Sequence, residues 1–282
     1  MRAGILALGF SLLLAALSGC ASEKPYRFGI AIDQISSPET ASEKQRAFEH
    51  FAKALSDRLG RPVTVELVPT GGDEAKALEL GTIDIALLKA VPYGHAKAKN
   101  ARIAGLATVV SRNENEEETT HSGYIIALNG SPIERIGDLK GKRFGFVRSS
   151  ASGLAYPHSY LAKQGLDFSA AGAAHVCFRN NAELIEALNA GRIDAGTTYR
   201  SQLLKPNSDL AHFKIIARVS NIPNPLIAVS ASLTEGERRK LTAALTGLPE
   251  SAFQGVGFFG LKPLDEKLYE PVVELGAANI CD

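Results

Sequence analysis

Residues 77–84 read Ala77-Leu78-Glu79-Leu80-Gly81-Thr82-Ile83-Asp84, and they return 110 positions later as Ala187-Leu188-Asn189-Ala190-Gly191-Arg192-Ile193-Asp194. Ala, Leu, Gly, Ile and Asp stay in register between the two copies. Each copy is typical of a helix end, a glycine cap and the start of a strand. Junctions of this kind converge on similar sequences by themselves, but the repeat also predicts two similar α/β lobes, each carrying the junction once.

The sequence around the first copy alternates between short β patterns and amphipathic helical patterns. We expect strands at 27–33, 63–68, 83–88 and 103–110, and helices at 47–59 and 73–80. Phe48, Phe51, Leu55 and Leu59 recur at helical spacing along the first of these helices. Such alternation is typical of a sheet with helices on both faces.

The first twenty residues predict a lipoprotein signal. Arg2 precedes the uncharged apolar run 5–17, and Leu17-Ser18-Gly19-Cys20 follows at once. The run is shorter than the roughly 20 residues that span a bilayer, so a secretory segment fits better than a transmembrane helix. We expect cleavage before Cys20, acylation of its thiol, including by palmitate, and a short polar tether at 20–24.

Charge and composition exclude some classes of partner. Loss of Arg2 leaves 30 basic residues (31 minus 1) against 30 acidic ones, so the mature surface has no net charge to attract nucleic acid. The chain is 45% hydrophobic and contains 26 glycines, which indicates a globular protein. We therefore expect no nucleic-acid partner, and we expect a monomer.

Two cysteines remain beside Cys20. Export permits a disulfide between Cys177 and Cys281, although Cys281 is one residue from the end of the sequence. The residues alone leave this pairing open.

An acidic stretch, 113–120, separates the two copies of the repeat. Contiguous acids repel, so we expect a solvated loop near the junction of the lobes rather than a cation site. The strands 123–128 and 226–229 are the best candidates for the two crossings between the lobes. The predicted division is a signal peptide at 1–19, a tether at 20–24, lobe one at 25–122 plus 226–282, and lobe two at 123–225.

Lobe two contains one stretch suited to holding an anion. A strand at 143–147 is followed by Ser149-Ser150-Ala151-Ser152-Gly153 and by a helix at 154–164. Unpaired N–H groups and the macrodipole at a helix start attract phosphate-like groups. Ser150 and Ser152 add hydroxyl donors, and Gly153 lets a ligand approach the backbone. An ordinary serine cap would also explain this turn.

Motifs of catalysis and metal binding fail in context. The glycine pattern at 255–260 is followed by only 22 residues, too few for a dinucleotide-binding βαβ unit. Neither Ser150 nor Ser152 sits in a G-x-S-x-G elbow, and His158 is typical of a helix surface. The six histidines are scattered, so the sequence predicts no metal site, no cofactor and no enzymatic activity.

The mature chain resembles the phosphonate, phosphite and phosphate binding lipoproteins of ABC importers. Ser150-Ala151-Ser152-Gly153 with Tyr156-Pro157 is similar to the most specific motif of that family, a serine and threonine turn followed by proline. Further similarity lies at 59–63, 81–86, 92–93, 138–143, 188–196 and 222–225. The resemblance implies a type II periplasmic binding protein fold, with two α/β lobes joined by two crossing strands and a ligand cleft between them.

The resemblance also implies a mechanism and a site. Ligand binds in the cleft, the lobes close, and the closed form docks to an ABC permease. Ser150 and Ser152 would hold a small oxyanion together with the backbone N–H groups of Ala151, Ser152 and Gly153. Tyr93 would close over it from lobe one.

Three positions depart from the family pattern. Ala151 replaces a threonine, Asn181 stands where many members have histidine, and Gly71-Gly72-Asp73 replaces a tyrosine expected before the second helix. A hydrogen bond to a charged group contributes about 1.5–3 kcal/mol, so each loss bears on which oxyanion binds. Lys89, at the cleft end of a lobe-one strand, either supplies charge or is a surface lysine.

Two functions follow from this sequence. The first is a membrane-anchored solute-binding protein that captures a phosphonate, phosphite or phosphate for an ABC importer. The second is a sensory or binding lipoprotein of the same fold with a different small ligand and no dedicated permease. We expect the anchored protein to face the periplasm or the cell exterior. Ala21 and Ser22 follow Cys20, and neither is the aspartate that often retains lipoproteins in the inner membrane, so the outer membrane is one possible destination.

Overall fold

The computed structural model describes residues 23–31, 41–113, 116–168, 174–199, 212–275 and 280–281. The predicted signal peptide at 1–19 and the predicted acylation site Cys20 lie outside the described residues. No helix among the described residues is both long and apolar enough to cross a membrane.

The first lobe is built on a sheet with the strand order β12-β4-β11-β3-β1-β2. Its strands are β1 (Tyr26–Ala31), β2 (Val63–Val68), β3 (Ile85–Leu88), β4 (Ala104–Asn113), β11 (Leu226–Val229) and β12 (Gly260–Pro263). β1 runs parallel to β2 and β3, whereas β11 is antiparallel to β3 and β4. Helices α1 (Ala41–Leu59) and α7 (Glu235–Thr246) pack on one face, and α2 (Gly71–Leu80), α3 (Ala90–Lys99) and α8 (Glu270–Leu275) pack on the other.

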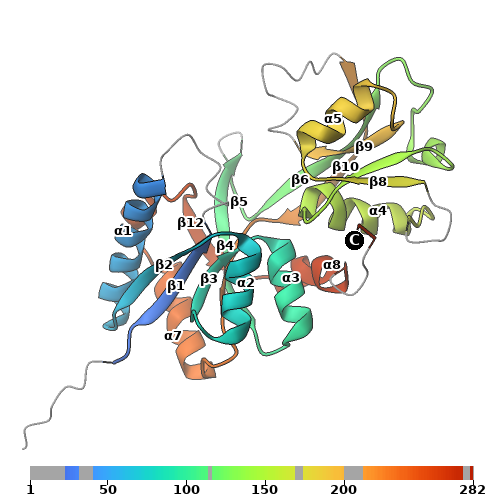
Figure 1. Ribbon diagram of the computed structural model, residues 1–282. Coiled ribbons are helices and arrows are strands. Elements are labelled where there is room, and N and C mark those ends of the chain that lie inside the picture. The colour runs from blue at the N-terminus through green and yellow to red at the C-terminus, as the bar shows by residue number, and fades with distance from the viewer. Residues whose placement is uncertain are drawn as a thin grey trace, which may run out of the picture.

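The second lobe is a five-stranded sheet with the order β10-β6-β9-β7-β8. Its strands are β6 (Thr120–Leu128), β7 (Phe144–Val147), β8 (His175–Phe178), β9 (Ala195–Tyr199) and β10 (Phe213–Pro223). A one-turn π-helix, η3 (Ala151–Ala155), leads directly into α4 (Tyr156–Lys163), and α5 (Asn181–Asn189) follows β8. Figure 1 shows the two lobes side by side, joined near β5 (Glu116–Glu118) and β6.

This architecture confirms the predicted α/β fold with two lobes, and it corrects several details. The predicted helix 47–59 begins earlier, at Ala41. The acidic stretch was predicted to be a loop, and that prediction is wrong in part because Glu116–Glu118 forms β5 and pairs antiparallel with Ser111–Asn113 of β4. The main-chain hydrogen bonds between β5 and the end of β4 offset the repulsion between the neighbouring glutamate side chains.

The repeated junction occupies the same place in each lobe. Gly81 ends α2 at φ 69°, and Gly191 follows α5 at φ 65°, a left-handed backbone that only glycine adopts readily. The two Ile residues of the repeat pack against glycines. A Cβ on Gly29 would lie 2.4 Å from Ile83, and a Cβ on Gly145 would lie 2.6 Å from Ile193. In both lobes the repeated isoleucine therefore packs directly on a glycine of the neighbouring strand.

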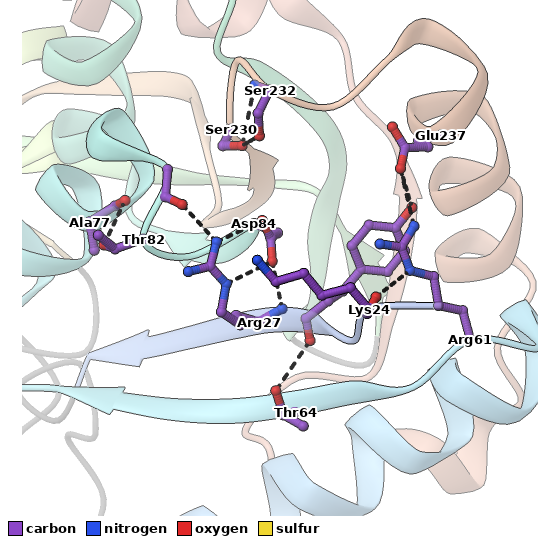
Figure 2. A network of polar contacts seen from close by, with 12 residues as sticks. Lys24, Arg27, Arg61, Thr64, Ala77, Thr82, Asp84, Ser230, Ser232 and Glu237 are labelled. Atoms are coloured by element: carbon purple, nitrogen blue, oxygen red, sulfur yellow. Dashed lines mark hydrogen bonds and ion pairs between the residues drawn. The ribbon is translucent and has the colours of Figure 1, made fainter. Parts of the chain in front are cut away.

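The aspartate of each repeat binds an arginine at the start of a central strand. Asp84 accepts the backbone N–H of Arg27 at 2.9 Å and its guanidinium at 3.0 Å through each carboxylate oxygen (Figure 2). Asp194 does the same for Arg143, at 2.8 Å from the backbone and at 3.2 and 2.7 Å from the guanidinium. Hydrogen bonds from Arg143 hold the pKa of Asp194 below its usual value. The repeat is therefore a duplicated structural unit, and its aspartates are structural.

The two crossings between the lobes lie side by side at Asn224. The side-chain amide of Asn224 donates to Val109 O at 3.1 Å, to Ser111 Oγ at 2.9 Å and to Glu118 O at 2.9 Å. β6 belongs wholly to the second sheet and β11 wholly to the first. The strands 123–128 and 226–229, which were predicted to cross between the lobes, therefore do not cross themselves. Each connection between the lobes lies just before one of these strands in the chain.

The C-terminal segment makes a third connection between the lobes. Helix α8 packs so closely on α3 that a Cβ on Gly94 would lie 2.4 Å from Val272 O. Tyr156, in lobe two, donates its hydroxyl to Leu268 O just before α8. Cys281 then forms a disulfide with Cys177 on β8, with the two Cα atoms 5.6 Å apart. The pairing that the sequence left open is thus present, and it joins the end of the chain to the edge strand of lobe two.

We expect Cys281→Ser to lower the free energy of unfolding by about 2–4 kcal/mol and to lower the thermal midpoint accordingly. A crosslink that closes a loop of 104 residues removes much conformational entropy from the unfolded chain. Thermal unfolding measured with and without a reductant tests this. The reductant should lower the wild-type midpoint and leave that of Cys281→Ser unchanged, whereas a wild-type midpoint indifferent to reduction would contradict the crosslink.

Candidate functional site

The carboxyl ends of two parallel strands bring the candidate residues of lobe two together. Val147 at the end of β7 pairs with Phe178 at the end of β8, so the segments that follow them leave the sheet side by side. Arg148 N–H donates to Phe178 O at 3.0 Å and extends this register by one residue. β6 begins at the same edge because it is antiparallel to β9, which runs parallel to β7. The candidate site therefore faces the crossings between the lobes.

The serine turn is shaped by backbone geometry before any ligand is considered. Ser149 has a φ of 55°, an uncommon conformation for a residue other than glycine, and it turns the chain from β7 toward η3. Ser150 is the N-cap, and its Oγ accepts the Gly153 N–H at 2.9 Å. The helix thus begins at Ala151 rather than at the predicted Leu154. Its first acceptor is Ser150 O, which takes the N–H of Leu154, so the N–H groups of Ala151 and Ser152 have no acceptor within the helix.

Packing fixes Ser152 and Gly153 tightly. Ser152 is 7% exposed, and its Cβ would lie 3.3 Å from a Cβ on Gly123 in β6. Thr197 Oγ donates to Gly153 O at 2.7 Å, which ties the turn to β9. A Cβ on Gly153 would lie only 2.7 Å from the Cβ of Val147. Glycine is therefore required at 153 by internal packing as well as by any close approach of a ligand.

Asn181 lies at the first helical position of α5, next to the serine turn along the sheet edge. Its Oδ1 is buried and has no hydrogen-bond partner among the described residues. This oxygen is an acceptor, so the partner it lacks is a hydrogen-bond donor and not an oxyanion. Asn181 is neutral, and only the Nδ2 of its amide can donate to an oxyanion.

Tyr93 lies in the core of the structure. It is 2% exposed, its Oη accepts the Gly105 N–H at 3.2 Å, and its ring meets that of Tyr269 edge to face at 5.6 Å. Burial raises its pKa to about 12, so the phenol is neutral at physiological pH. It belongs to the same buried hydrophobic cluster as Leu154 of η3. Tyr93 is therefore part of the core and does not point into open space in this conformation.

Lys89 is the N-cap residue of α3 at the carboxyl end of β3. It is exposed, and no ion pair engages it among the residues that the structure describes. It lines a cavity that also touches Ser111 and Asn224 at the crossings. The lobe-one wall thus presents a cation near the junction of the lobes, and both interpretations that the sequence left open for this residue stay open.

No group of His, Cys, Asp or Glu residues suited to a metal ion occurs within the described part of the chain. Three residues at the junction were missed by sequence reasoning. Ser149 supplies the strained turn, Thr197 pins it to β9, and Asn224 binds both crossings. Ser149 and Asn224 lie in segments that the sequence singled out, but no sequence pattern indicated the left-handed backbone of Ser149 or the hydrogen bonds of Asn224. Thr197 acts through a tertiary contact that has no local sequence pattern.

A protein-family model described as "ABC transporter, phosphonate, periplasmic substrate-binding protein" matches residues 35–269. A search of the curated proteins gives no match.

Solved structures of binding proteins share the fold. A binding protein component of an ABC phosphonate transporter from Pseudomonas aeruginosa is 19% identical, with a TM-score of 0.57 over 92% of this chain and 88% of the other. A Prochlorococcus marinus protein solved in complex with methylphosphonate is 17% identical, with a TM-score of 0.58 over 90% and 97%. The periplasmic aliphatic sulphonate binding protein of Escherichia coli is 17% identical, with a TM-score of 0.54 over 90% and 87%.

The junction also contains a histidine whose neutral form is favoured by burial. His121 Nδ1 lies 3.2 Å from Asn224 Oδ1, and burial lowers the pKa of His121 below its ordinary value. The unfolded chain therefore takes up a proton at a higher pH than the folded chain does. The contribution of the neutral His121 side chain to stability is therefore present above the pKa of an unfolded histidine, about 6.5, and it is lost as the pH falls below that value.

We expect His121→Gln to flatten the dependence of stability on pH between 7 and 5. Glutamine cannot take up a proton, although it keeps a polar group beside Asn224. Chemical denaturation at several pH values measures this slope in both proteins. The slope is the readout, because the substitution itself shifts the absolute stability, and parallel curves for the two proteins would refute the assignment.

Proposed function

Because this chain belongs to the family of periplasmic substrate-binding proteins of phosphonate ABC transporters, we propose that it captures a small phosphorus oxyanion for an ABC importer. Phosphonate, phosphite and phosphate are the candidate ligands. The family consists of transport components that bind solutes, and the protein is a binding protein rather than an enzyme. The observation that carries the choice of ligand class is the serine turn at the start of η3.

In the proposed site the oxyanion lies at the start of η3. Ser150 and Ser152 hydroxyls and the N–H groups of Ala151 and Ser152 supply donors, and η3 continues into α4, so the macrodipoles of the two helices add positive potential. The Gly153 N–H is already bonded to Ser150 Oγ, so we propose that it orients that hydroxyl rather than the ligand. Asn181 contributes from α5. We assign Tyr93 a positioning role through the buried hydrophobic cluster that it shares with Leu154 of η3.

The lobes move about the crossings in this proposal. Lobe one comprises 25–122 and 226–282, and lobe two comprises 123–225. A ligand that contacts both walls of the cleft favours the closed form by its differential affinity for that form. An ABC permease then recognises the closed protein, and the protein acts as a monomer.

We also propose that the chain is exported and anchored by lipid on Cys20, facing the periplasm or the cell exterior, with the outer membrane as one destination. The support is the sequence itself: an apolar run, Leu17-Ser18-Gly19-Cys20, and a polar tether before β1. Paired acyl chains give stable attachment that a single chain does not.

Ser150→Ala and Ser152→Ala should each weaken phosphonate binding tenfold or more. Each removes a hydrogen bond to a charged group, and about 1.4 kcal/mol corresponds to one decade of affinity. Titration calorimetry with methylphosphonate, phosphite, phosphate and methanesulfonate measures the effect and separates phosphorus from sulfur oxyanions. Ser159→Ala, on α4 beyond the turn, is the matched control and should bind like the wild type.

Ser150→Ala also removes an N-cap, which contributes about 1 kcal/mol to stability. Thermal midpoints without ligand report that loss separately from binding. Unchanged affinity for every oxyanion in both serine variants would overturn the assigned site, and tighter binding of methanesulfonate than of methylphosphonate would overturn the ligand class.

For the anchor, Cys20→Ser should abolish the incorporation of palmitate and leave the signal peptide uncleaved. Serine has no thiol to carry the lipid, so neither lipid attachment nor the cleavage that follows it takes place. Metabolic labelling with radioactive palmitate, followed by gel electrophoresis, measures both effects, because the uncleaved chain has the larger mass. Cys281→Ser serves as the control, because it should keep the label. A labelled Cys20→Ser protein would contradict the assignment.

A further inference from the structure

Lobe one contains a cavity of about 830 Å³ beside the crossings. It lies at the carboxyl ends of β1 and β3, between α1 and the segment 250–259 that precedes β12. At one end it reaches Ser111 and Asn224. Lys89, at the start of α3, also lines it. On the lobe-two side, Ser152 and Ile222 both lie against Gly123 of β6, and Ile222 is two residues before Asn224. The cavity and the proposed anion turn therefore flank the same junction.

The walls of this cavity are mainly apolar. Phe48, Val109, Phe253 and Phe258 line it, and the rings of Phe253 and Phe258 lie 5.6 Å apart. Phe259 lines it as well and is 43% exposed, one of few large apolar side chains so exposed among the described residues. The guanidinium of Arg112 lies 4.4 Å from the centre of the Phe259 ring. An aromatic face held open at a cavity is suited to an organic group.

Two lysines place positive charge at this apolar surface. Lys44, on α1, lines the cavity and is only 7% exposed, which is uncommon for lysine. Lys89 is exposed at another part of the lining. Glu250 is the one acidic residue in the described lining. The exposed ammonium group of Lys89 beside apolar walls favours an occupant that is apolar in part and carries negative charge.

The size of the cavity separates the candidate ligands. Pockets of about 300–1,000 Å³ accommodate organic molecules of moderate size. Phosphate and phosphite have no organic part, so bound at the serine turn they would leave the cavity to water. Burial of an alkyl chain contributes about 0.8 kcal/mol for each CH₂ group. A ligand with a carbon chain would gain affinity from these walls that an inorganic oxyanion cannot.

We infer that this cavity seats the organic substituent of the ligand, and that the substituent ends in a second acidic group near Lys44 or Lys89. The ligand class is an organophosphonate or phosphate monoester with a further carboxylate or phosphate. This inference rests on the proposed function, because it takes the first oxyanion to bind at Ser150 and Ser152. Phe259 and the two lysines then determine specificity.

Titration calorimetry of the purified protein with three phosphonates tests the inference. Methylphosphonate probes the anion turn alone, butylphosphonate adds an apolar chain, and 3-phosphonopropionate adds a carboxylate on a chain of similar length. We expect 3-phosphonopropionate to bind at least tenfold more tightly than methylphosphonate, with butylphosphonate between them. Lys89→Gln should weaken 3-phosphonopropionate at least fivefold and leave methylphosphonate unchanged.

Two further variants complete the design. Phe259→Ala should weaken butylphosphonate and 3-phosphonopropionate and leave methylphosphonate unchanged, and its exposed position limits any effect on folding. Lys262→Gln removes a lysine from the exposed surface of β12, outside the cavity lining, and should alter no affinity.

The outcomes separate this inference from the function on which it rests. Equal affinities for all three phosphonates, combined with a loss of binding in Ser150→Ala, would overturn the inference and leave the proposed function standing. Failure of every phosphonate to bind in the wild type would overturn both. A preference for butylphosphonate over 3-phosphonopropionate would overturn the assignment of a second acidic group.

Discussion

The arrangement of the two lobes depends on the hydrogen bonds of Asn224. This residue is 5% exposed, and its side-chain amide donates to Val109 and Ser111 of β4 and to Glu118 of β5. Its backbone N–H donates to Thr119 O, and its backbone carbonyl accepts the Tyr269 hydroxyl at 2.9 Å. One buried residue of the returning crossing is thus bonded to the outgoing crossing and to the C-terminal segment. Leaving this amide without its hydrogen bonds would cost about 1–3 kcal/mol. We therefore expect the lobes to rotate about Asn224 while its hydrogen bonds stay intact.

The lobes themselves could be predicted to a large extent. The repeat at Ile83-Asp84 and Ile193-Asp194 identified two related units, and the structure gives its aspartates a common role with Arg27 and Arg143. The arginines were not predicted, because they lie 57 and 51 residues from their partners and a local pattern carries no information about such pairing. β5 was missed for a similar reason: strand pairing with β4 outweighs the charge repulsion that the acidic stretch displays in isolation.

The candidate site was only partly predictable. Strand-loop-helix order placed Ser150 at a helix start, and parallel register brings Asn181 to the same edge. The position of Tyr93 depended on which face of α3 is buried. That face packs on α8, whose sequence lies about 180 residues further along the chain, so helical periodicity within α3 could not reveal it. The large cavity of lobe one was equally hidden, because its lining comes from α1, the ends of three strands and the segment 250–259.

The C-terminal disulfide limits the range of lobe movement without freezing it. α8 is fixed to α3, and only five residues lie between Leu275 and Cys281, which is bonded to the edge strand of lobe two. A fully extended chain reaches about 3.5 Å per residue, so Cys281 lies no more than roughly 21 Å from the end of α8. The Cα of Cys177 is 5.6 Å from that of Cys281. Restricting the open state lowers the entropy that ligand binding must overcome when the lobes close. The disulfide on one side of the junction and Asn224 at its centre therefore leave the cleft side, with the serine turn and the lobe-one cavity, as the part that is free to adjust to ligand.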